Sequence, residues 1–398
     1  MKYISRKISS HILHALERGK SVLLLGPRQT GKSTLIEKQI KPDLSYSFLQ
    51  PGIRNRYEQN PSLLTQEIEA EIKIRKLNNP IIVIDEVQKI PLIMDVVQDL
   101  IDRHIARFIL TGSSARKLKH GLNVNLLPGR VVLYHLDPLS LSELPEQFIN
   151  LEQLLTYGSL PGILAVDSVQ DRELDLKTYV HTYLDQEVRA EALVRNMGSF
   201  TQFLFLAASE SGNLINFSQL SQTIGVAHTT IASYYQILED CLIAEKIEPI
   251  PEGKIRKRLS KAPKYLFFDL GVRRQSAEEG ISLPISILSH LFEQFVGLEL
   301  IRHTRLKANL TKICYWRSHD GPEVDFVIQE NNQYTPIEVK WTDRPTAKDF
   351  QHLKTFLEEY PDSEMAYLIC RTPKPLLFEK KIMALPWQDI PKVMVSTR

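Results

Sequence analysis

The sequence has little of what identifies secreted, metal-stapled or membrane-spanning proteins. It contains three cysteines, Cys241, Cys314 and Cys370, which are far apart and do not occur in metal-ligand pairs. This spacing argues against a disulfide framework or a zinc site and favours a reducing environment. No apolar run approaches the ~20 residues that a membrane-spanning helix needs. We therefore expect a cytoplasmic protein with no membrane partner.

The chain also lacks a strong excess of charge of either sign. Its 398 residues carry a formal net charge of +2, so composition alone does not imply a nucleic-acid partner. The N-terminus is basic at Lys2, Arg6 and Lys7, but the apolar run that follows, Val22–Leu25, is too short for the core of a signal peptide. Apolar residues make up 43% of the chain, which allows a sizeable core in each domain.

Hydrophobic patterning divides the chain into three regions, in line with domains of roughly 150 residues. In residues 1–145, strand-like runs alternate with helical stretches, which predicts a parallel sheet covered by helices on both faces. These runs are Val22–Leu25, Ile81–Ile84, Phe108–Leu110 and Val131–Tyr134. Residues 146–280 are predicted to be mostly helical, and residues 281–398 to form a second, small α/β unit.

The most specific motif is the segment GPRQTGKS at residues 26–33, which matches G-x-x-x-x-G-K-[ST] at every fixed position. Two glycines let such a loop wrap until its backbone N–H groups face phosphate oxygens. In this chemistry Lys32 contacts the β- and γ-phosphates, and Ser33 offers its hydroxyl to Mg²⁺. The loop follows an apolar strand and precedes a helical stretch, so we expect ATP and Mg²⁺ here. The expected contact residues are Gly26, Pro27, Arg28, Gln29, Thr30, Gly31, Lys32, Ser33 and Thr34.

Two carboxylates, Asp85 and Glu86, follow the apolar strand Ile81–Ile84. Ligands of open α/β sheets bind at the carboxyl ends of the strands. We therefore expect Asp85 to hold Mg²⁺ and Glu86 to orient and polarise an attacking water, although acids can also simply end a strand. Another strand-like run ends at Thr111 and Ser113, which could sense the γ-phosphate or only form a turn.

The order of these motifs resembles a large group of bacterial and archaeal AAA-like ATPases that carry a C-terminal domain of uncharacterised role. The segments that carry the resemblance are GPRQTGKST, IIVIDEVQKIP, FILTGSS and LPGRVVLYHLDPLSLSEL, followed by TYGSLPG, YLDQEV, LFEQFVGLEL, YWRSHDGPEVDFVI and IEVK. It covers nearly the whole chain. The resemblance assigns Arg130 to an arginine-finger position, which would act in trans and imply a homo-oligomer.

A helix-turn-helix is predicted within Asn216–Ile243, with Ser218 as the first cap, Gly225 at the turn and a second helix from His228. A basic segment follows that resembles the wing of a winged helix. Its basic residues are Lys254, Arg256, Lys257, Arg258, Lys261 and Lys264. Such a wing could lie along a DNA backbone without reading its sequence, or it could be a solvated loop, and winged helices also bind proteins.

In the third region, Asp325 lies on one predicted strand, and Glu338 and Lys340 lie on the next, where side chains two residues apart share a face. The arrangement resembles the PD-(D/E)xK nuclease core, with Glu293 as an additional acid on the preceding helix. Asp325, Glu338 and the Val339 carbonyl could hold Mg²⁺, and Glu323 could join them. The alternative is an ordinary half-exposed sheet with local ion pairs.

The predicted fold is thus α/β: a P-loop NTPase domain, a helical winged-helix region and a small nuclease-like unit. The leading hypothesis is an ATPase whose nucleotide cycle controls a DNA-contacting C-terminal half. Two alternatives stay open, namely a non-catalytic ATP-dependent switch that docks a protein partner and an ATP-regulated, metal-dependent DNA nuclease.

Overall fold

The computed structural model describes residues 3–114, 127–184, 197–250, 262–307, 310–318, 321–331 and 333–396. These residues divide into two units. The first contains the described residues up to Leu139 and Ile237–Ile243, and the second contains the remainder. Among the described residues, no helix combines the length and the apolar composition that a membrane crossing requires.

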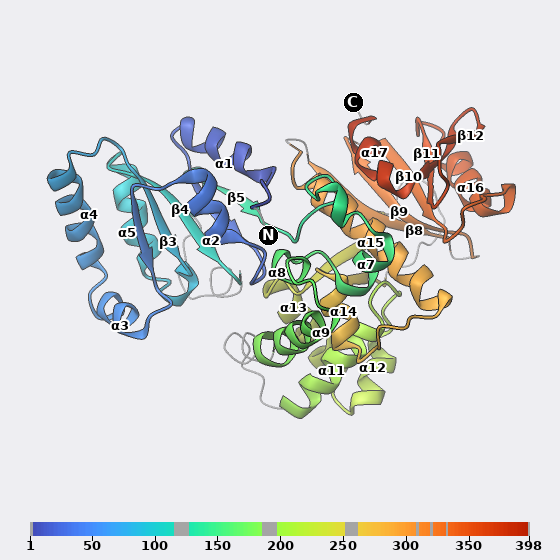
Figure 1. Ribbon diagram of the computed structural model, residues 1–398, viewed down its shortest axis with the longest axis horizontal. Coiled ribbons are helices and arrows are strands. Elements are labelled where there is room, and N and C mark those ends of the chain that lie inside the picture. The colour runs from blue at the N-terminus through green and yellow to red at the C-terminus, as the bar shows by residue number, and fades with distance from the viewer. Residues whose placement is uncertain are drawn as a thin grey trace. The chain divides into compact units, whose positions relative to one another are not determined.

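A five-stranded parallel sheet forms the centre of the first unit (Figure 1). In spatial order its strands are β2 (Leu44–Ser47), β3 (Ile81–Asp85), β4 (Arg107–Gly112), β1 (Ser21–Leu25) and β5 (Val131–His135). The four strands expected from the apolar runs are confirmed. Edge strand β2 was missed because it is short, its sequence is LSYS and only its first residue is buried.

Helices cover both faces of this sheet, as alternation of strands and helices predicts. They are α1 (Ile8–Glu17), α2 (Lys32–Leu35, continued by a π-helical turn over Ile36–Ile40), α3 (Pro51–Gln59), α4 (Ser62–Arg75) and α5 (Ile93–Asp102). Leu23 and Leu25 of β1 share a buried cluster with Val97 and Leu100 of α5. Helix α1 packs against β1 and β5. The central strands β1, β3 and β4 are thereby largely buried, whereas the edge strands β2 and β5 are partly exposed.

The second unit contains a mixed eight-stranded sheet. In spatial order its strands are β12 (Leu376–Glu379), β13 (Ile382–Pro386), β11 (Ala366–Cys370), β10 (Gln333–Val339), β9 (Glu323–Glu330), β8 (Thr311–Arg317), β6 (Ala244–Pro249) and β7 (Lys264–Phe267). Because β6 pairs with β8, this sheet joins the two regions that the sequence analysis separates at residue 280.

The helices of the second unit flank this sheet or precede it. They are α7 (Leu151–Tyr157), α8 (Pro161–Leu164), α9 (Val169–Thr178, continued by a π-helical segment over Tyr179–Leu184), α11 (Met197–Ser209), α12 (Phe217–Ile224), α13 (His228–Asp240), α14 (Leu270–Ser276), α15 (Ile285–Thr304), α16 (Gln351–Glu359) and α17 (Ile390–Ser396). Helix α16 packs on β9, β10 and β11 through Leu353 and Phe356, whereas α15 contacts β7, β8 and β10.

The two helices predicted within Asn216–Ile243 are present as α12 and α13. Gly225 ends α12 at a φ of 75°, a left-handed conformation that glycine adopts without strain. The expected cap at Ser218 is wrong, because the side chain of Asn216 accepts the capping hydrogen bond from the Gln219 N–H at 3.1 Å. Strands β6 and β7 then pair antiparallel.

Candidate functional site

The phosphate-loop segment leaves β1 at Leu25 and enters α2 at Lys32. A side chain at Gly26 would collide with the carbonyl oxygen of Leu136, and Gly31 has a φ of 95°, so the backbone requires glycine at both positions. Ser33 and Thr34 are exposed on the first turn of α2. The loop therefore has the backbone geometry that its two glycines predict, and the hydroxyl groups of Ser33 and Thr34 are exposed.

Lys32 lies against the inside of this loop. Only 8% of the residue is exposed, and its ammonium donates hydrogen bonds to the carbonyl oxygens of Gly26 at 2.6 Å and Pro27 at 3.0 Å. The Thr30 hydroxyl also donates to Pro27, at 2.8 Å. Arg28 is half-buried and Gln29 is exposed, with a left-handed φ of 61°. These contacts hold a positive charge within the loop that is expected to bind phosphates.

Arg6 supports the loop from behind, and the sequence analysis did not identify it as a site residue. Its guanidinium donates to the Thr30 carbonyl at 2.7 Å and to the Asp137 carbonyl at 2.7 Å, and only 5% of the residue is exposed. Arg6 thus ties the loop to the segment that follows β5. The only sequence signal for Arg6 is its place in the basic N-terminus, which gives no indication of a nucleotide site.

The acidic strand end lies next to the expected sensor residues. Thr111 donates a hydrogen bond to the Asp85 carboxylate, and Ser113 donates to Oε2 of Glu86 at 3.0 Å. Glu86 is 6% exposed and has a φ of 58°, a left-handed conformation that is uncommon and strained for a residue with a side chain. The strained backbone and the Ser113 hydrogen bond fix where the Glu86 carboxylate points.

Gln88 is a second residue that the sequence analysis missed. Its amide donates to Oε2 of Glu86 at 2.5 Å and to the Ser113 hydroxyl at 3.2 Å. A side chain at Gly112 would come within 2.7 Å of the Gln88 amide oxygen, so a larger residue at position 112 would displace the end of the Gln88 side chain. Glu86, Gln88 and Ser113 therefore form one buried polar network.

The strand order explains how these distant segments meet. Strand β4 lies between β1 and β3, so its end separates the phosphate loop from the acidic pair. The register pairs Leu25 with Gly112, and the Gly26 N–H donates to the Gly112 carbonyl at 3.1 Å. Because the strands are parallel, all three carboxyl ends lie at one edge of the sheet, where ligands of open α/β sheets bind.

Mg²⁺ would be held here by the Ser33 hydroxyl and the Asp85 carboxylate. Both are oxygen ligands, and Asp85 is only half-buried. Mg²⁺ is usually bound by one or two carboxylates together with substrate phosphates and water, so this sparse donor set suits it. The residues at this edge are consistent with the expected ion.

Arg130 lies at the opposite edge of the same sheet. Its carbonyl accepts from the Ser21 N–H at 3.1 Å, at the start of β1, so the length of a five-residue strand separates it from the loop. That length is about 16 Å at 3.3 Å per residue. The guanidinium is paired with Asp102 at 2.5 and 2.9 Å, which lowers the pKa of the Asp102 carboxyl. Arg130 therefore cannot reach the nucleotide of its own chain.

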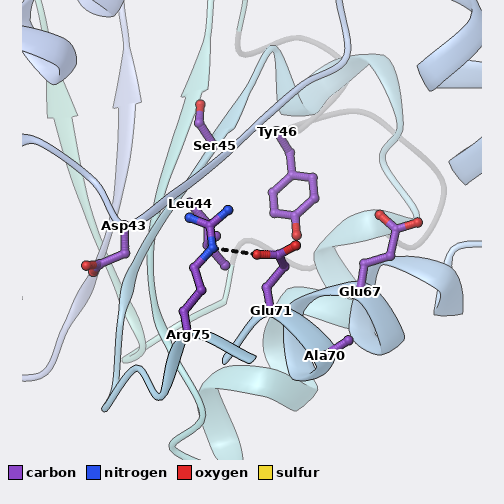
Figure 2. A pocket seen from close by; sticks show the side chains of 8 residues that line it. All are labelled: Asp43, Leu44, Ser45, Tyr46, Glu67, Ala70, Glu71 and Arg75. Carbon is purple, nitrogen blue, oxygen red and sulfur yellow. Dashed lines mark ion pairs between the residues drawn. The ribbon is translucent and has the colours of Figure 1, made fainter. Parts of the chain in front are cut away.

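A cavity of about 410 Å³ lies beside the edge strand β2 (Figure 2). Its lining residues are Asp43, Leu44, Ser45, Tyr46, Glu67, Ala70, Glu71 and Arg75. Its charged groups are already satisfied, since Arg75 pairs with Glu71 at 2.6 Å and Asp43 accepts from the Ile81 N–H at 2.8 Å. The cavity contains none of the residues expected to bind nucleotide.

The basic segment is divided between the described and the undescribed parts of the chain. The residues outside the described part are Lys254, Arg256, Lys257, Arg258 and Lys261. Lys264 begins β7, and only 3% of it is exposed. The expectation that Lys264 contacts a DNA backbone is wrong, because its ammonium is buried among carboxylates.

The acidic cluster of the C-terminal unit consists of Glu293, Glu323, Asp325 and Glu338. The structure brings these residues together from α15, β9 and β10. Asp325 accepts from the Val339 N–H at 2.8 Å, and Glu338 accepts from the Lys340 ammonium at 2.7 Å. The shared face of Glu338 and Lys340 is thus as expected, and Glu323 belongs to the same group.

Burial perturbs this cluster strongly. Burial, together with the nearby Glu293 carboxylate, raises the pKa of Asp325 to about 7. Burial and Asp325 likewise raise the pKa of Glu338 to about 8. Burial by itself would lower the pKa of Lys264, but Glu293, Asp325 and Glu323 raise it above its usual value. Within the described residues, no group of three or more His, Cys, Asp or Glu side chains is arranged to hold a metal ion.

Three family descriptions match successive parts of the chain. Residues 18–145 match a family described as an AAA domain. Residues 149–280 and 288–390 match two domains of unknown function, DUF8612 and DUF4143. The first region is therefore an AAA-like P-loop domain, as its motifs predict, whereas the other two matches name no activity.

Two relatives extend over most of the chain. The uncharacterized protein Rv2008c of Mycobacterium tuberculosis is 26% identical over 345 residues, which is 86% of this chain and 75% of the relative. The uncharacterized protein MJ1637 of Methanocaldococcus jannaschii is 23% identical in an alignment that covers 68% of this chain and 64% of the relative.

Two solved structures show weak similarity. Cdc6p from Pyrobaculum aerophilum is 12% identical, with a TM-score of 0.27, and the match covers 73% of this chain and 96% of that chain. A STAND protein with a tetratricopeptide repeat sensor, from Pyrococcus horikoshii, is 15% identical, with a TM-score of 0.27, covering 76% and 47%. Similarity at this level establishes no shared function.

Proposed function

We propose that this protein binds ATP with Mg²⁺ at the phosphate loop and hydrolyses it with Glu86 as the residue that positions the attacking water. The single observation that carries the proposal is the orientation of Glu86 by Ser113 and Gln88 at the same sheet edge as the loop. A protein that only binds nucleotide does not need a carboxylate held in a strained conformation at this position.

Each residue has a defined task in this scheme. Lys32 supplies positive charge to the β- and γ-phosphates, and the loop N–H groups cradle them. Mg²⁺, held by Ser33 and Asp85, would neutralise charge that develops on the phosphate oxygens. Glu86 accepts a hydrogen bond from the attacking water and aligns this water with the γ-phosphate. Thr111 and Ser113 sense the γ-phosphate through their hydrogen bonds to Asp85 and Glu86. Phosphate release by the wild type and Glu86→Gln tests the scheme.

We propose that the nucleotide cycle controls the C-terminal half of the protein and that this half contacts DNA in the cytoplasm. The helix-turn-helix supports this, because His228, Thr229 and Ser233 are exposed along α13. Tyr234 does not belong to this surface, since only 6% of it is exposed. Such a face offers hydrogen bonds and little charge, and it equally suits a protein partner. Binding of labelled duplex DNA by the wild type and by Thr229→Glu decides between the two partners.

Arg130 is assigned a role in trans. Its position at the far sheet edge excludes its own active site, whereas a neighbouring copy could present it to the next nucleotide. This proposal requires a homo-oligomer in which the Arg130–Asp102 ion pair opens or turns toward the partner.

We propose domain boundaries at residues 1–145, 146–280 and 281–398.

A further inference from the structure

The acidic cluster of Glu293, Glu323, Asp325 and Glu338 does not match the metal site that the nuclease resemblance implies. One observation favours a metal: Oε2 of Glu338 is buried and has no hydrogen-bond partner among the described residues. Mg²⁺ requires a near-octahedral set of oxygens, so a single free oxygen is not sufficient by itself. The other oxygens of the cluster therefore decide the question.

Two of those oxygens, one from Glu293 and one from Glu323, are paired with a buried cation from the chain itself. The Lys264 ammonium lies 2.8 Å from Oε1 of Glu323 and 3.3 Å from Oε1 of Glu293, and its side chain is 4% exposed. It also lies 5.4 Å from the centre of the Tyr315 ring, whose π face favours a cation. A divalent ion on the same carboxylates would be held against a buried positive charge and would be repelled by it.

The charges in the cluster are nearly balanced without a metal. Arg317 lies 3.3 Å from Oε2 of Glu323, and Lys340 lies 2.7 Å from Oε1 of Glu338. With Lys264, three cations face four carboxylates, so the cluster carries at most one negative charge, and the raised pKa values of Asp325 and Glu338 lower that charge further near neutral pH. A bound divalent ion would therefore make the cluster net positive. Buried charges are stable when they are paired and hydrogen-bonded, and this cluster meets that condition except at Oε2 of Glu338.

We infer that the ammonium group of Lys264 takes the place of a divalent metal ion in the acidic cluster, so that the C-terminal unit is a structural and binding platform rather than a metal-dependent nuclease. Lys264 ties the first residue of β7 to α15 and to β9. The cluster then fixes the hairpin that follows the helix-turn-helix against the C-terminal sheet.

The test uses the full-length, nucleotide-free protein and titrates Mn²⁺ by electron paramagnetic resonance. Asp325→Asn is the matched variant, because any weak Mn²⁺ binding at the phosphate loop is common to both proteins. We expect the two proteins to bind the same amount of Mn²⁺ and to show the same change of melting temperature with Mn²⁺. A site present in the wild type and lost in Asp325→Asn would overturn the inference, as would Mn²⁺-dependent cleavage of single-stranded or duplex DNA that this variant abolishes.

A gain of metal binding provides the converse test. Lys264→Met removes the ammonium and frees the carboxylates, so we expect it to bind Mn²⁺ at least ten-fold more tightly than the wild type. Lys264→Arg, which keeps a cation, should show no gain, and adding Asp325→Asn to Lys264→Met should remove it. A folded Lys264→Met protein with no gain would contradict the inference. Circular dichroism shows whether Lys264→Met is folded. If it is unfolded, the comparison of Mn²⁺ binding by the wild type and Asp325→Asn tests the inference.

Discussion

The hydroxyl of Ser113 donates a hydrogen bond of 3.0 Å to Oε2 of Glu86, although the two residues follow different strands, β4 and β3. Both side chains are more than nine-tenths buried, and the Gln88 amide contacts both. A network of this kind aims the Glu86 carboxylate, so its members affect the chemical step more than they affect nucleotide binding.

Ser113→Ala removes one of the groups that aim this carboxylate. We expect kcat for ATP hydrolysis to fall about 10-fold, while the dissociation constant of ATP changes less than about 2-fold. Steady-state phosphate release and binding of a fluorescent ATP analogue measure the two quantities. Ser45→Ala, at an exposed serine of β2, is the control. Equal losses of kcat and of nucleotide affinity in Ser113→Ala would indicate a general disturbance of the fold.

Arg6→Met tests the support behind the phosphate loop. The change leaves the Thr30 and Asp137 carbonyl oxygens without their buried donor, so we expect a loss of about 2–4 kcal/mol in the free energy of unfolding and weaker ATP binding. Thermal melts with and without ATP and Mg²⁺ provide both measurements. Arg18→Met, at an exposed position on the end of α1, should change neither. ATP affinity equal to that of the wild type would show that Arg6 does not shape the loop.

Arg130→Ala distinguishes an arginine finger from a simple ion pair with Asp102. If Arg130 acts in trans, we expect ATP binding to be retained and kcat to fall 10- to 1000-fold. Asp102→Ala is the matched control, because it breaks the same pair and leaves the arginine in place. Hydrolysis is measured across a range of protein concentrations, since a site completed by a neighbour depends on assembly. Similar ATPase activities for the wild type and Arg130→Ala would show that Arg130 forms the ion pair with Asp102 and has no role in hydrolysis.

Glu338 should make stability depend on pH. Its pKa is raised from 4.5 to about 8 in the folded chain, so the folded state retains a proton that the unfolded state loses. The resulting stability is present at low pH and is lost as pH rises from about 4.5 to about 8. Relative to Glu338→Gln, we expect the wild type to lose about 1–3 kcal/mol between pH 5 and 8.

The control for that comparison is Glu358→Gln, which changes an exposed acid on α16. Thermal melts of all three proteins in buffers from pH 5 to 8 provide the measurement. Parallel pH profiles for the wild type and Glu338→Gln would show that the Glu338 carboxyl ionises normally in the fold.

Sequence patterns predicted most of the fold because they depend on local burial. Apolar runs such as Val22–Leu25 identify strands buried on both faces, and Gly225 marks a turn that needs a left-handed residue. Edge strand β2 and the pairing of β6 with β8 were missed, since a polar edge has no periodic signal and a parallel pairing between distant strands has none in sequence.

The candidate site was predictable only where a motif fixes it. The phosphate loop and the Asp85–Glu86 pair are consecutive in sequence, whereas Arg6 and Gln88 reach the site through contacts that the fold creates. For Lys264, sequence patterns predicted a contact that the fold does not make. A lysine at the end of a basic run is expected on the surface, but β7 directs it into a group of carboxylates.

The most direct test of the account compares ATP binding and hydrolysis by the wild type, Lys32→Ala and Glu86→Gln, with Glu37→Gln, an exposed acid on the π-helical turn after α2, as the control. ATP affinity is measured by calorimetry with Mg²⁺, and turnover by phosphate release. We predict that Lys32→Ala does not bind ATP, and that Glu86→Gln binds it as the wild type does but hydrolyses it at least about 100-fold more slowly. Turnover by Glu86→Gln at the wild-type rate would contradict the central claim and assign the water-activating role to another residue.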